Sequence, residues 1–329
     1  MEKYAIKKKG NTPLKLILKI LLFLIISVAL IFIIIVGSWN GMKYAFYKDY
    51  YSISTELRKN PGLDDGYVTQ GNCYYQPKDY YITSGYMSDK SLPSRIYNVR
   101  PNGDVGFCEI YNADGSKNSE HFGGISYYDG NFYVASNSKL HVINAENVIN
   151  YSKATISYSV DVNNHASFTY SKDESIFVGE FNDSTNYKTS NEEKIDDNTT
   201  YHAIISEYIA DSINEDNQPI LKNVYHIRDK VQGFCITDSG KMVLSTSWGA
   251  SPSIFYVYNT PTEVKRIENS VNHYYLDDSV LSRTIEGPAM AEDLDYYNGK
   301  VITSSEAAST KYLFGKLFLY DKIEGLTIA

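Results

Sequence analysis

A long apolar segment lies near the start of the chain. From Ile20 to Val36 the sequence carries no charge, and Ser27 is its one polar residue. With the apolar residues of 14–18 added and Lys19 extending toward the headgroups, a helix of this length crosses a hydrocarbon core of about 30 Å. We therefore predict one transmembrane helix over residues 14–38.

The basic residues around this segment are unevenly distributed. Lysines crowd the stretch before the apolar core, whereas residues 37–50 mix Lys43 and Lys48 with Asp49. Because cytoplasmic flanks carry an excess of Lys and Arg, we expect residues 1–13 to form a cytoplasmic basic tail and the rest of the chain to lie outside the cell membrane. The alternative is a cleaved signal peptide, but the apolar run exceeds the roughly 7 to 15 residues of such a signal.

Beyond residue 65 the pattern changes to short apolar strands that recur in five imperfect copies. Each copy opens with a polar and a small residue, continues as an apolar strand, turns, and returns as a second strand, which in most copies ends in Ser or Thr. Turns such as Asp129-Gly130 and Asn298-Gly299 are typical of tight hairpins. The copies occupy Gln70–Ser84, Gly123–Ser136, His165–Val178, Gln232–Thr246 and Glu292–Ser304.

Further strands follow the hairpins and bring most units close to four strands. We predict third strands at Arg95–Val99, Lys139–Ile143, Ala203–Tyr208, Ser253–Tyr258 and Lys316–Tyr320, and fourth strands at Gly106–Tyr111 and Val224–Ile227. Four strands in units of about 40 to 60 residues are the dimensions of a propeller blade. The pattern predicts an all-β domain, a five-bladed β-propeller over residues 66–329, joined to the membrane helix by a juxtamembrane linker at 39–65.

Two other architectures remain open at this point. A β-sandwich has similar strands, but it does not require a polar-small pair at the start of every hairpin. A six-bladed propeller results if Asn269–Thr284 forms a degenerate blade rather than an outer strand and its return. The polar stretch Asn182–Tyr201 is predicted to be a long loop.

Propeller geometry brings distant polar residues to one face. The innermost strand of every blade starts on the same side of the disc, and the antiparallel second strand ends there. We therefore expect a funnel-shaped ligand site. Its candidate residues are Gln70, His121, His165, Gln232 and Glu292 from the first set, and Tyr86, Glu180, Trp248 and Glu306 from the second.

The chemistry expected of this funnel depends on its carboxylates and imidazoles. Glu292 and Glu306 would act as an acid and base pair if burial separated their pKa values. His121 or His165 would move a proton or bind a metal, and His165 is the candidate for a third catalytic residue. A calcium ion held by Glu292, Gln70 and Gln232 would also suit the preference of hard cations for oxygen. The competing interpretation is structural, since polar side chains around a propeller channel often cap backbone groups.

Composition narrows the function classes. The chain has a formal net charge of −8, and its lysines are dense at the cytoplasmic end, so the outer domain is more acidic still. This charge argues against a nucleic-acid partner. The cysteines, Cys73, Cys108 and Cys235, cannot all pair within one chain, although a Cys73–Cys108 bridge remains open. The sequence contains no nucleophile elbow, zinc helix or phosphate loop.

Two resemblances accompany these patterns. Thr69-Gln70-Gly71, followed by Ile82-Thr83-Ser84-Gly85, resembles the first blade of propeller-type glutaminyl cyclotransferases, which are five-bladed. That resemblance implies a catalytic glutamate at the end of the second strand, but this chain has Thr83 there, and Glu306 occupies the comparable place in the last blade. The segment 288–293 resembles uncharacterised, membrane-anchored bacterial cell-surface propeller proteins, which implies fold and location.

Together these observations predict a membrane-anchored, extracytoplasmic β-propeller that binds a small molecule, peptide or glycan at its funnel. The alternative function is a hydrolase or a glutaminyl-cyclotransferase-like enzyme that uses the Glu and His residues of the funnel mouth. The sequence does not decide between a binding protein and an enzyme.

Overall fold

A computed structural model describes residues 12–213, 218–312 and 320–328. The chain divides into two compact units, Met1–Phe46 and Tyr47–Ala329. In the first unit, residues 12–46 form one helix, α1 (Thr12–Phe46). The second unit contains all the strands found in the described residues, together with the short helices α2 (Lys48–Ile53) and α3 (Ala145–Asn150).

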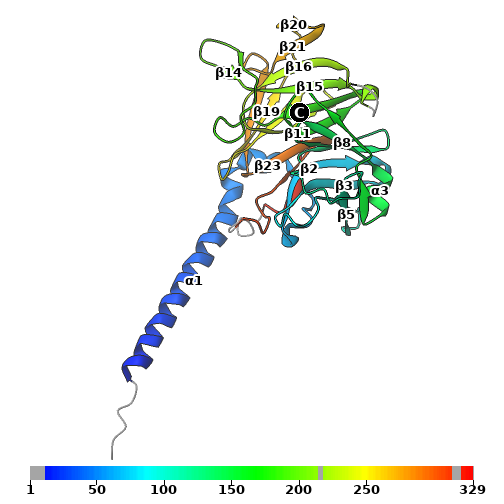
Figure 1. Ribbon diagram of the computed structural model, residues 1–329. Coiled ribbons are helices and arrows are strands. Elements are labelled where there is room, and N and C mark those ends of the chain that lie inside the picture. The colour runs from blue at the N-terminus through cyan, green and yellow to red at the C-terminus, as the bar shows by residue number, and fades with distance from the viewer. Residues whose placement is uncertain (1–11, 214–217, 313–319, 329) are drawn as a thin grey trace, which may run out of the picture. The chain divides into compact units, whose positions relative to one another are not determined.

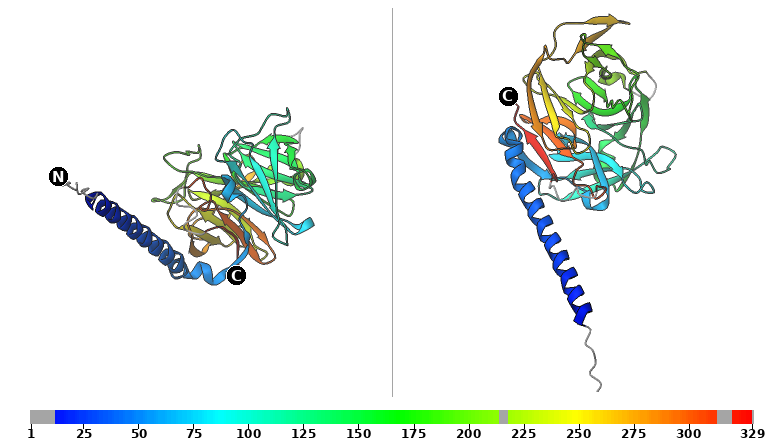
Figure 2. Two further views of the ribbon diagram at one scale, coloured as in Figure 1. Left: turned by 90° about the horizontal axis from the view of Figure 1, so that it is seen from below. Right: turned by 90° about the vertical axis from the view of Figure 1, so that its left-hand side faces the viewer.

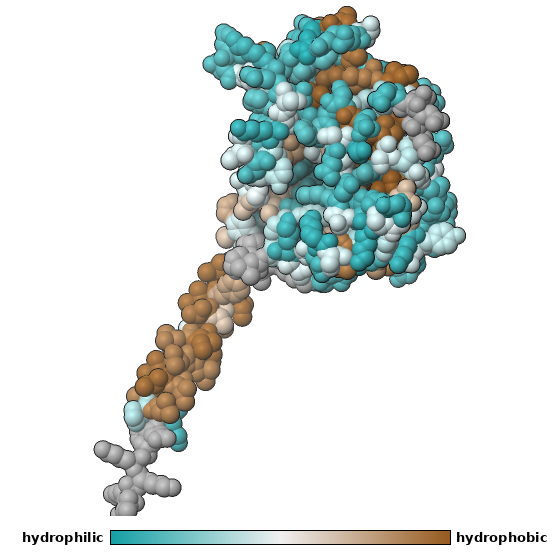
Figure 3. Space-filling view, viewed as in Figure 1, coloured by the Kyte–Doolittle hydropathy of each residue, from teal (hydrophilic) through white to brown (hydrophobic). Residues whose placement is uncertain are grey.

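Helix α1 confirms that an apolar helix precedes the propeller. It spans the predicted segment 14–38 and continues to Phe46. Among the described residues, it is the one helix long and apolar enough to cross a membrane, and Figure 3 shows its apolar side chains. These properties fit both a membrane anchor and a signal sequence.

The second unit is a five-bladed propeller, as the repeats predicted. The first blade comprises β2 (Tyr67–Tyr75), β3 (Tyr80–Met87), β4 (Arg95–Val99) and β5 (Val105–Tyr111); the second comprises β6 (Ile125–Tyr128), β7 (Asn131–Ser136), β8 (Lys139–Asn144) and β10 (Tyr158–Asp161). The third comprises β11 (Ala166–Lys172), β12 (Ser175–Glu180), β15 (Ala203–Ile209) and β16 (Leu221–Ile227). The fourth comprises β17 (Val231–Ile236), β18 (Met242–Thr246), β19 (Ser253–Tyr258) and β22 (Leu281–Gly287).

The fifth blade joins the two ends of the domain. Its strands are β23 (Ala291–Tyr297), β24 (Lys300–Ser305), β25 (Lys322–Leu326) and, outermost, β1 (Ser54–Lys59). Strand β1 pairs antiparallel with β25, and Figure 2 shows this early blue segment beside the red C-terminal strand. The segment 39–65, expected to be a linker, therefore contains a strand of the propeller. The third strand predicted at Lys316–Tyr320 falls largely outside the described residues.

Extra strands lengthen two blades at their outer edges. Strand β9 (Lys153–Thr155) adds parallel to β5, and β21 (Val271–Tyr275) adds parallel to β16 and carries β20 (Arg266–Glu268). The segment Asn269–Thr284 thus holds an added strand of the third blade and the start of β22, and it does not form a sixth blade. The predicted loop at Asn182–Tyr201 includes a small hairpin, β13 (Glu193–Lys194) and β14 (Thr200–Tyr201).

The core lies between the blades. Figure 1 shows the inner strands β2, β11 and β23 near the middle of the domain, whereas β5 and β20 lie at its periphery. Side chains such as Ile82, Phe132, Val178 and Leu244 fill the space between neighbouring sheets and are fully buried. The cysteines are also buried and unpaired. Cys73 and Cys108 cannot bridge, because two strands separate β2 from β5 at about 4.8 Å per strand.

Candidate functional site

Four of the five inner strands contain an irregularity at the same place. The pairing register shifts between Thr69 and Gly71 in β2, between Ala166 and Phe168 in β11, between Val231 and Gly233 in β17, and between Ala291 and Leu294 in β23. A bulge of this kind leaves a residue out of the ladder and redirects its side chain. The residues so placed are Gln70, Ser167 and Gln232 in the first three strands, and Glu292 and Asp293 in β23; of these, Gln70, Ser167, Gln232 and Glu292 line one pocket.

The small residue of the repeated pair has a steric reason. A Cβ atom on Gly71 would lie 2.7 Å from the carbonyl oxygen of Gly123, and one on Gly233 would lie 2.6 Å from the Cα atom of Asp293. Both contacts are with backbone atoms of another blade, so a side chain at either glycine would force two blades apart. The polar-small pair therefore combines a side chain directed into the pocket with a close approach of the inner strands.

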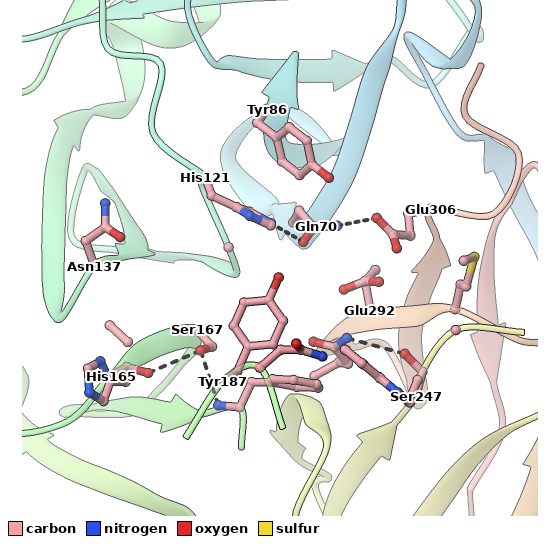
Figure 4. Close-up of a pocket in the computed structure, with 18 of the residues that line it drawn as sticks. Gln70, Tyr86, His121, Asn137, His165, Ser167, Tyr187, Ser247, Glu292 and Glu306 are labelled. Atoms are coloured by element: carbon pink, nitrogen blue, oxygen red, sulfur yellow. Dashed lines mark hydrogen bonds between the residues drawn. The ribbon is translucent and has the colours of Figure 1, made fainter. Parts of the chain in front are cut away.

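The pocket has a volume of about 580 Å³. Figure 4 shows its residues in two facing groups, with Tyr86, His121, Gln70, Glu306 and Glu292 on one side and His165, Ser167, Tyr187 and Ser247 on the other. The remaining residues of the lining are Gly123, Asn137, Ser138, Ala166, Phe181, Asn186, Lys188, Thr189, Gln232, Trp248, Gly249, Met290, Lys311 and Tyr312.

A hydrogen-bonded chain runs along the first side. Gln70 Nε2 donates to Glu306 Oε2 at 2.8 Å, and Gln70 Oε1 lies 2.6 Å from His121 Nε2. Because an amide oxygen only accepts, His121 must carry its proton on Nε2. Burial, followed by the charges of Lys90 and Lys311, lowers the pKa of His121 to about 4. The imidazole is therefore neutral at physiological pH, with Nδ1 as its acceptor.

Glu292 and Glu306 form an interacting carboxylate pair. Glu292 is 2% exposed, and its pKa lies well above the ordinary value, first because of burial and then because of the charge of Glu306. Burial also raises the pKa of Glu306, while hydrogen bonds from Tyr312 and Gln70 and the charge of Lys311 oppose that rise. The surroundings thus favour a proton on Glu292 and a charge on Glu306.

Lysine side chains approach the same side of the pocket. Lys311 donates to the hydroxyl of Tyr86, and its Nζ lies 4.7 Å from the centre of that ring. Lys90 Nζ lies 4.4 Å from the centre of the same ring. The ring of Tyr86 also lies 4.2 Å from that of His121. Positive charge therefore accompanies the carboxylates, so the site as a whole is mixed rather than simply acidic.

The sequence-predicted residues mostly converge. Of the nine candidates, eight line the pocket: Gln70, Tyr86, His121, His165, Gln232, Trp248, Glu292 and Glu306. Their catalytic or binding roles stay predictions. His165 lies across the pocket from the carboxylates, with Nδ1 3.3 Å from Ser138 Oγ, whereas His121 is linked to Glu306 through Gln70.

Glu180 is the exception. It ends β12, where a funnel residue was expected, but its carboxylate is buried and accepts hydrogen bonds from the amides of His165 and Ile204 and from the Asn191 side chain. Burial raises the pKa of Glu180, and these hydrogen bonds oppose that rise. The carboxylate therefore ties the insertion after β12 to its own blade and does not line the pocket.

Several lining residues escaped the sequence analysis. Ser167 occupies the bulge in β11, so the alignment that matched His165 with Gln70 was shifted by two residues. Tyr187 and Lys188 come from the insertion after β12, and Lys311 and Tyr312 follow β24. Loops carry no periodic signal. For Tyr187 and Lys188, only the length of the insertion and its position at the pocket-facing end of β12 could have indicated a place in the pocket.

The structure does not provide a preformed metal site in the residues that it describes. No group of three or more His, Cys, Asp or Glu side chains in 12–213, 218–312 and 320–328 is arranged to hold a metal ion. Of the residues expected to bind calcium, Gln70 directs its oxygen at His121. A calcium ion in the channel therefore stays a prediction of the sequence.

Comparisons with known proteins give neighbours for the fold. No protein-family model matches the sequence, and no curated protein matches it. Among solved structures, the glutaminyl cyclase of Myxococcus xanthus is similar at 8% identity, with a TM-score of 0.44, over 77% of this chain and 91% of that one. The PQQ-bound aldose sugar dehydrogenase of Streptomyces coelicolor is similar at 13% identity, with a TM-score of 0.43, over 77% and 78% of the two chains.

A third neighbour is the WD40 β-propeller domain of Doa1, at 12% identity and a TM-score of 0.37, over 77% of this chain and 91% of that domain. These names describe the neighbours, and identities this low do not transfer an activity. The architecture is carried by strand pairing within the chain itself, and this chain is a five-bladed β-propeller.

Proposed function

We propose that this protein is a membrane-anchored, extracytoplasmic propeller that binds a small molecule, a peptide or a glycan in its axial pocket. The observation that carries the proposal is the convergence of all five blades on one pocket of about 580 Å³. Four bulged inner strands supply Gln70, Ser167, Gln232 and Glu292, and the second blade adds His121. Concave sites with a few converging polar groups are the usual form of a ligand site.

The proposed location follows from the N-terminal sequence. Helix α1 is long and apolar enough to span a membrane, and the lysines of the sequence are concentrated before its apolar core. By the positive-inside rule, this arrangement favours a cytoplasmic N-terminus and an outer propeller. The membrane is therefore the first partner that we propose, and the pocket ligand is the second.

A stability screen tests ligand binding. The full chain in detergent is melted in the presence of libraries of small molecules, short peptides and oligosaccharides, since a ligand that binds the folded state raises the Tm. We expect the hits to lose their effect in Gln70→Ala, which removes the contact between His121 and Glu306, and to keep it in Glu174→Gln, an exposed position on the β11–β12 turn. A hit unaffected by Gln70→Ala would place binding elsewhere.

The carboxylate pair favours a second candidate function, a hydrolase or a glutaminyl-cyclotransferase-like enzyme. Glu292, with its raised pKa, is suited to donate a proton, and Glu306, which accepts from Gln70 Nε2, is suited to take one. Assays with esters, lactones, glycosides and peptides with N-terminal glutamine would detect such activities.

If the enzyme hypothesis holds, Glu292→Gln and Glu306→Gln each lower turnover about 100-fold or more with the fold intact, the scale of lost acid–base catalysis. Activity that needs the Glu292 proton persists above the ordinary glutamate pKa and falls as the pH rises through the raised one. Unchanged turnover in both variants would leave the pocket a binding site.

A further inference from the structure

An aromatic cluster forms part of the pocket opposite the carboxylates. Phe181, Tyr187 and Trp248 all line the pocket. The ring centres of Phe181 and Trp248 are 5.7 Å apart with planes 33° from parallel, and Tyr187 meets both edge-on at 5.7 and 6.1 Å. Each ring is thus held in place by the other two.

This aromatic cluster is not covered by the protein. Trp248 is 38% exposed and Tyr187 is 55% exposed, although both line the pocket. Large aromatic side chains normally bury most of their surface, because each contributes substantial hydrophobic stabilisation when covered. Because its rings pack against one another and remain partly exposed to the pocket, the aromatic cluster is suited to a ligand with a flat apolar face.

The side of the pocket that carries Gln70, His121 and Glu306 is suited to hydroxyl groups on the ligand. Gln70, His121 and Glu306 already form a chain in which donors meet acceptors, and Lys311 accompanies the carboxylates. A cationic ligand would therefore meet charge that is already partly balanced. Hydroxyl groups, which both donate and accept, would match the donors and acceptors of this side, including His121 Nδ1, which is an acceptor in the tautomer that the contact with Gln70 requires.

Other neutral polar residues of the pocket are also suited to hydroxyl groups on a ligand. Ser167 and Ser247, which face the carboxylates, supply hydroxyl groups to the pocket, and Gln232, Asn186 and Asn137 supply amides. Gln232 Nε2 lies 3.4 Å from Ser247 Oγ, a long hydrogen bond that a ligand could replace. Neutral donors and acceptors therefore surround the space between the aromatic cluster and the carboxylates.

We propose that the pocket takes a sugar ring of a glycan, with its apolar C–H face on Trp248 and its hydroxyl groups directed at Gln70, His121 and the Glu292–Glu306 pair. A pyranose has one flat apolar face, which suits the aromatic cluster, and a rim of hydroxyl groups, which suits the polar residues on the facing side. This proposal rests on the proposed binding function and names the ligand class for it.

The tryptophan content of the chain provides a direct readout. The sequence contains two tryptophans, Trp39 and Trp248. In a full-length Trp39→Phe variant, the indole fluorescence reports the pocket alone. The protein is held in a polyoxyethylene detergent, which carries neither a sugar nor a cation, and is titrated with neutral oligosaccharides of several linkages, with tetramethylammonium chloride and with aromatic amines.

We expect at least one oligosaccharide to shift the Trp248 emission saturably, while the amines do not. Calorimetry with that oligosaccharide should show binding weakened about tenfold or more in Trp248→Ala, the scale of losing an aromatic anchor. Tyr151→Ala, which removes a ring that is 64% exposed outside the pocket, should bind it as the parent does.

Two other outcomes separate the ligand class from the binding function. Binding of amines without any oligosaccharide would overturn the glycan proposal and leave the proposed pocket function standing. No binding of sugars, amines or any hit from the small-molecule and peptide libraries, with a cooperative melting transition intact, would overturn both. Oligosaccharide binding that Trp248→Ala leaves unchanged would also contradict the proposed stacking.

Discussion

The buried carboxylate of Asp293 connects two blades that are not neighbours in the propeller. Asp293, the residue after the pocket's Glu292, is fully buried, and its Oδ2 accepts a hydrogen bond from the amide of Ile125 at 3.0 Å. Strands β23 and β6 belong to blades that are not neighbours in the ring, so the contact crosses the axis. Burial is the main reason that the pKa of Asp293 lies well above its ordinary value.

This raised pKa has a definite consequence for stability. The folded state holds the Asp293 proton more tightly than the unfolded chain, so this group's contribution is greatest at low pH and is lost as the pH rises through the folded pKa. Asp293→Asn keeps an acceptor for Ile125 and removes the charge. We expect the variant to be more stable than the parent by about 1 kcal/mol or more at pH 8.

Urea unfolding of both proteins between pH 5 and 9 checks this expectation. The two stability curves should diverge as the pH increases. Titrating groups that do not interact with Asp293 cancel in the comparison, whereas the charge of Asp293 itself raises the pKa of Glu292, so the difference reports Asp293 together with its coupling to Glu292. Parallel curves would mean that Asp293 carries its charge in the folded and the unfolded state alike over this range.

The glycine of the repeated pair can be tested separately. Gly71→Ala places a methyl group 2.7 Å from both the Gly123 carbonyl oxygen and the Ile125 amide nitrogen. Because both atoms are backbone, we expect a loss of about 2 to 3 kcal/mol in the free energy of unfolding. Gly103→Ala is the control, since Gly103 has a positive φ but no atom within 4 Å, and it should lose about 1 kcal/mol. Equal losses in the two variants would show that the strands near the axis can separate.

At the scale of elements, closure of the ring depends on the N-terminal strand. Strand β1 is the outer strand of the fifth blade, and the buried Asn60 beyond it donates to the carbonyl oxygen of Ser305 and accepts from the hydroxyl of Thr69. These contacts join the first and fifth blades. Without β1, the edge of β25 would be left unpaired.

A pair of truncations tests this closure. A chain that starts at residue 47 retains α2, β1 and Asn60, whereas one that starts at residue 66 lacks them. We expect the shorter chain to melt at least about 5 °C lower, or without a cooperative transition, since about 3 kcal/mol corresponds to that shift in a domain of this size. Asn60→Ala should fall between the two. Equal melting temperatures would show that the four remaining blades and the three-stranded fifth blade suffice.

The closure also shows where sequence patterns stop being informative. The strands of the blades could be predicted because each pairs with a strand close to it in the sequence: the third strands β4 and β19 begin and end at the residues predicted for them. Strand β1 pairs with a segment more than 260 residues away, and nothing in Ser54–Lys59 identifies that partner. The parallel additions of β9 and β21 depend on distant partners in the same way.

The residues of the candidate site also differ in whether the local sequence pattern could indicate them. Gln70, Gln232 and Glu292 were predictable because the repeat marks the bulge that directs them into the pocket. Glu180 looked equivalent by position, but the amides of His165 and Ile204 bind its carboxylate, and these contacts appear only in three dimensions. Tyr187 was missed because its place depends on how the insertion after β12 folds.

At the scale of the whole molecule, the open choice is between an anchor and a cleaved signal. Helix α1 extends over 35 residues, about 52 Å at 1.5 Å per residue, which exceeds a hydrocarbon core of about 30 Å. We predict that α1 is retained and that the N-terminus faces the cytoplasm. The protein expressed in a bacterial host should then sediment with membranes and resist extraction by high salt, and its intact mass should include residues 14–38.

Orientation is tested with a tag at each end. Protease added to intact spheroplasts should remove a tag placed after Ala329 and spare one placed before Met1. Replacing Lys3, Lys7, Lys8 and Lys9 with glutamine weakens the charge bias that sets the orientation, so the protected fraction of the N-terminal tag should fall. A mature protein that begins beyond residue 38 and remains in the soluble fraction would instead identify the helix as a signal. The propeller and its pocket would then act free of the membrane.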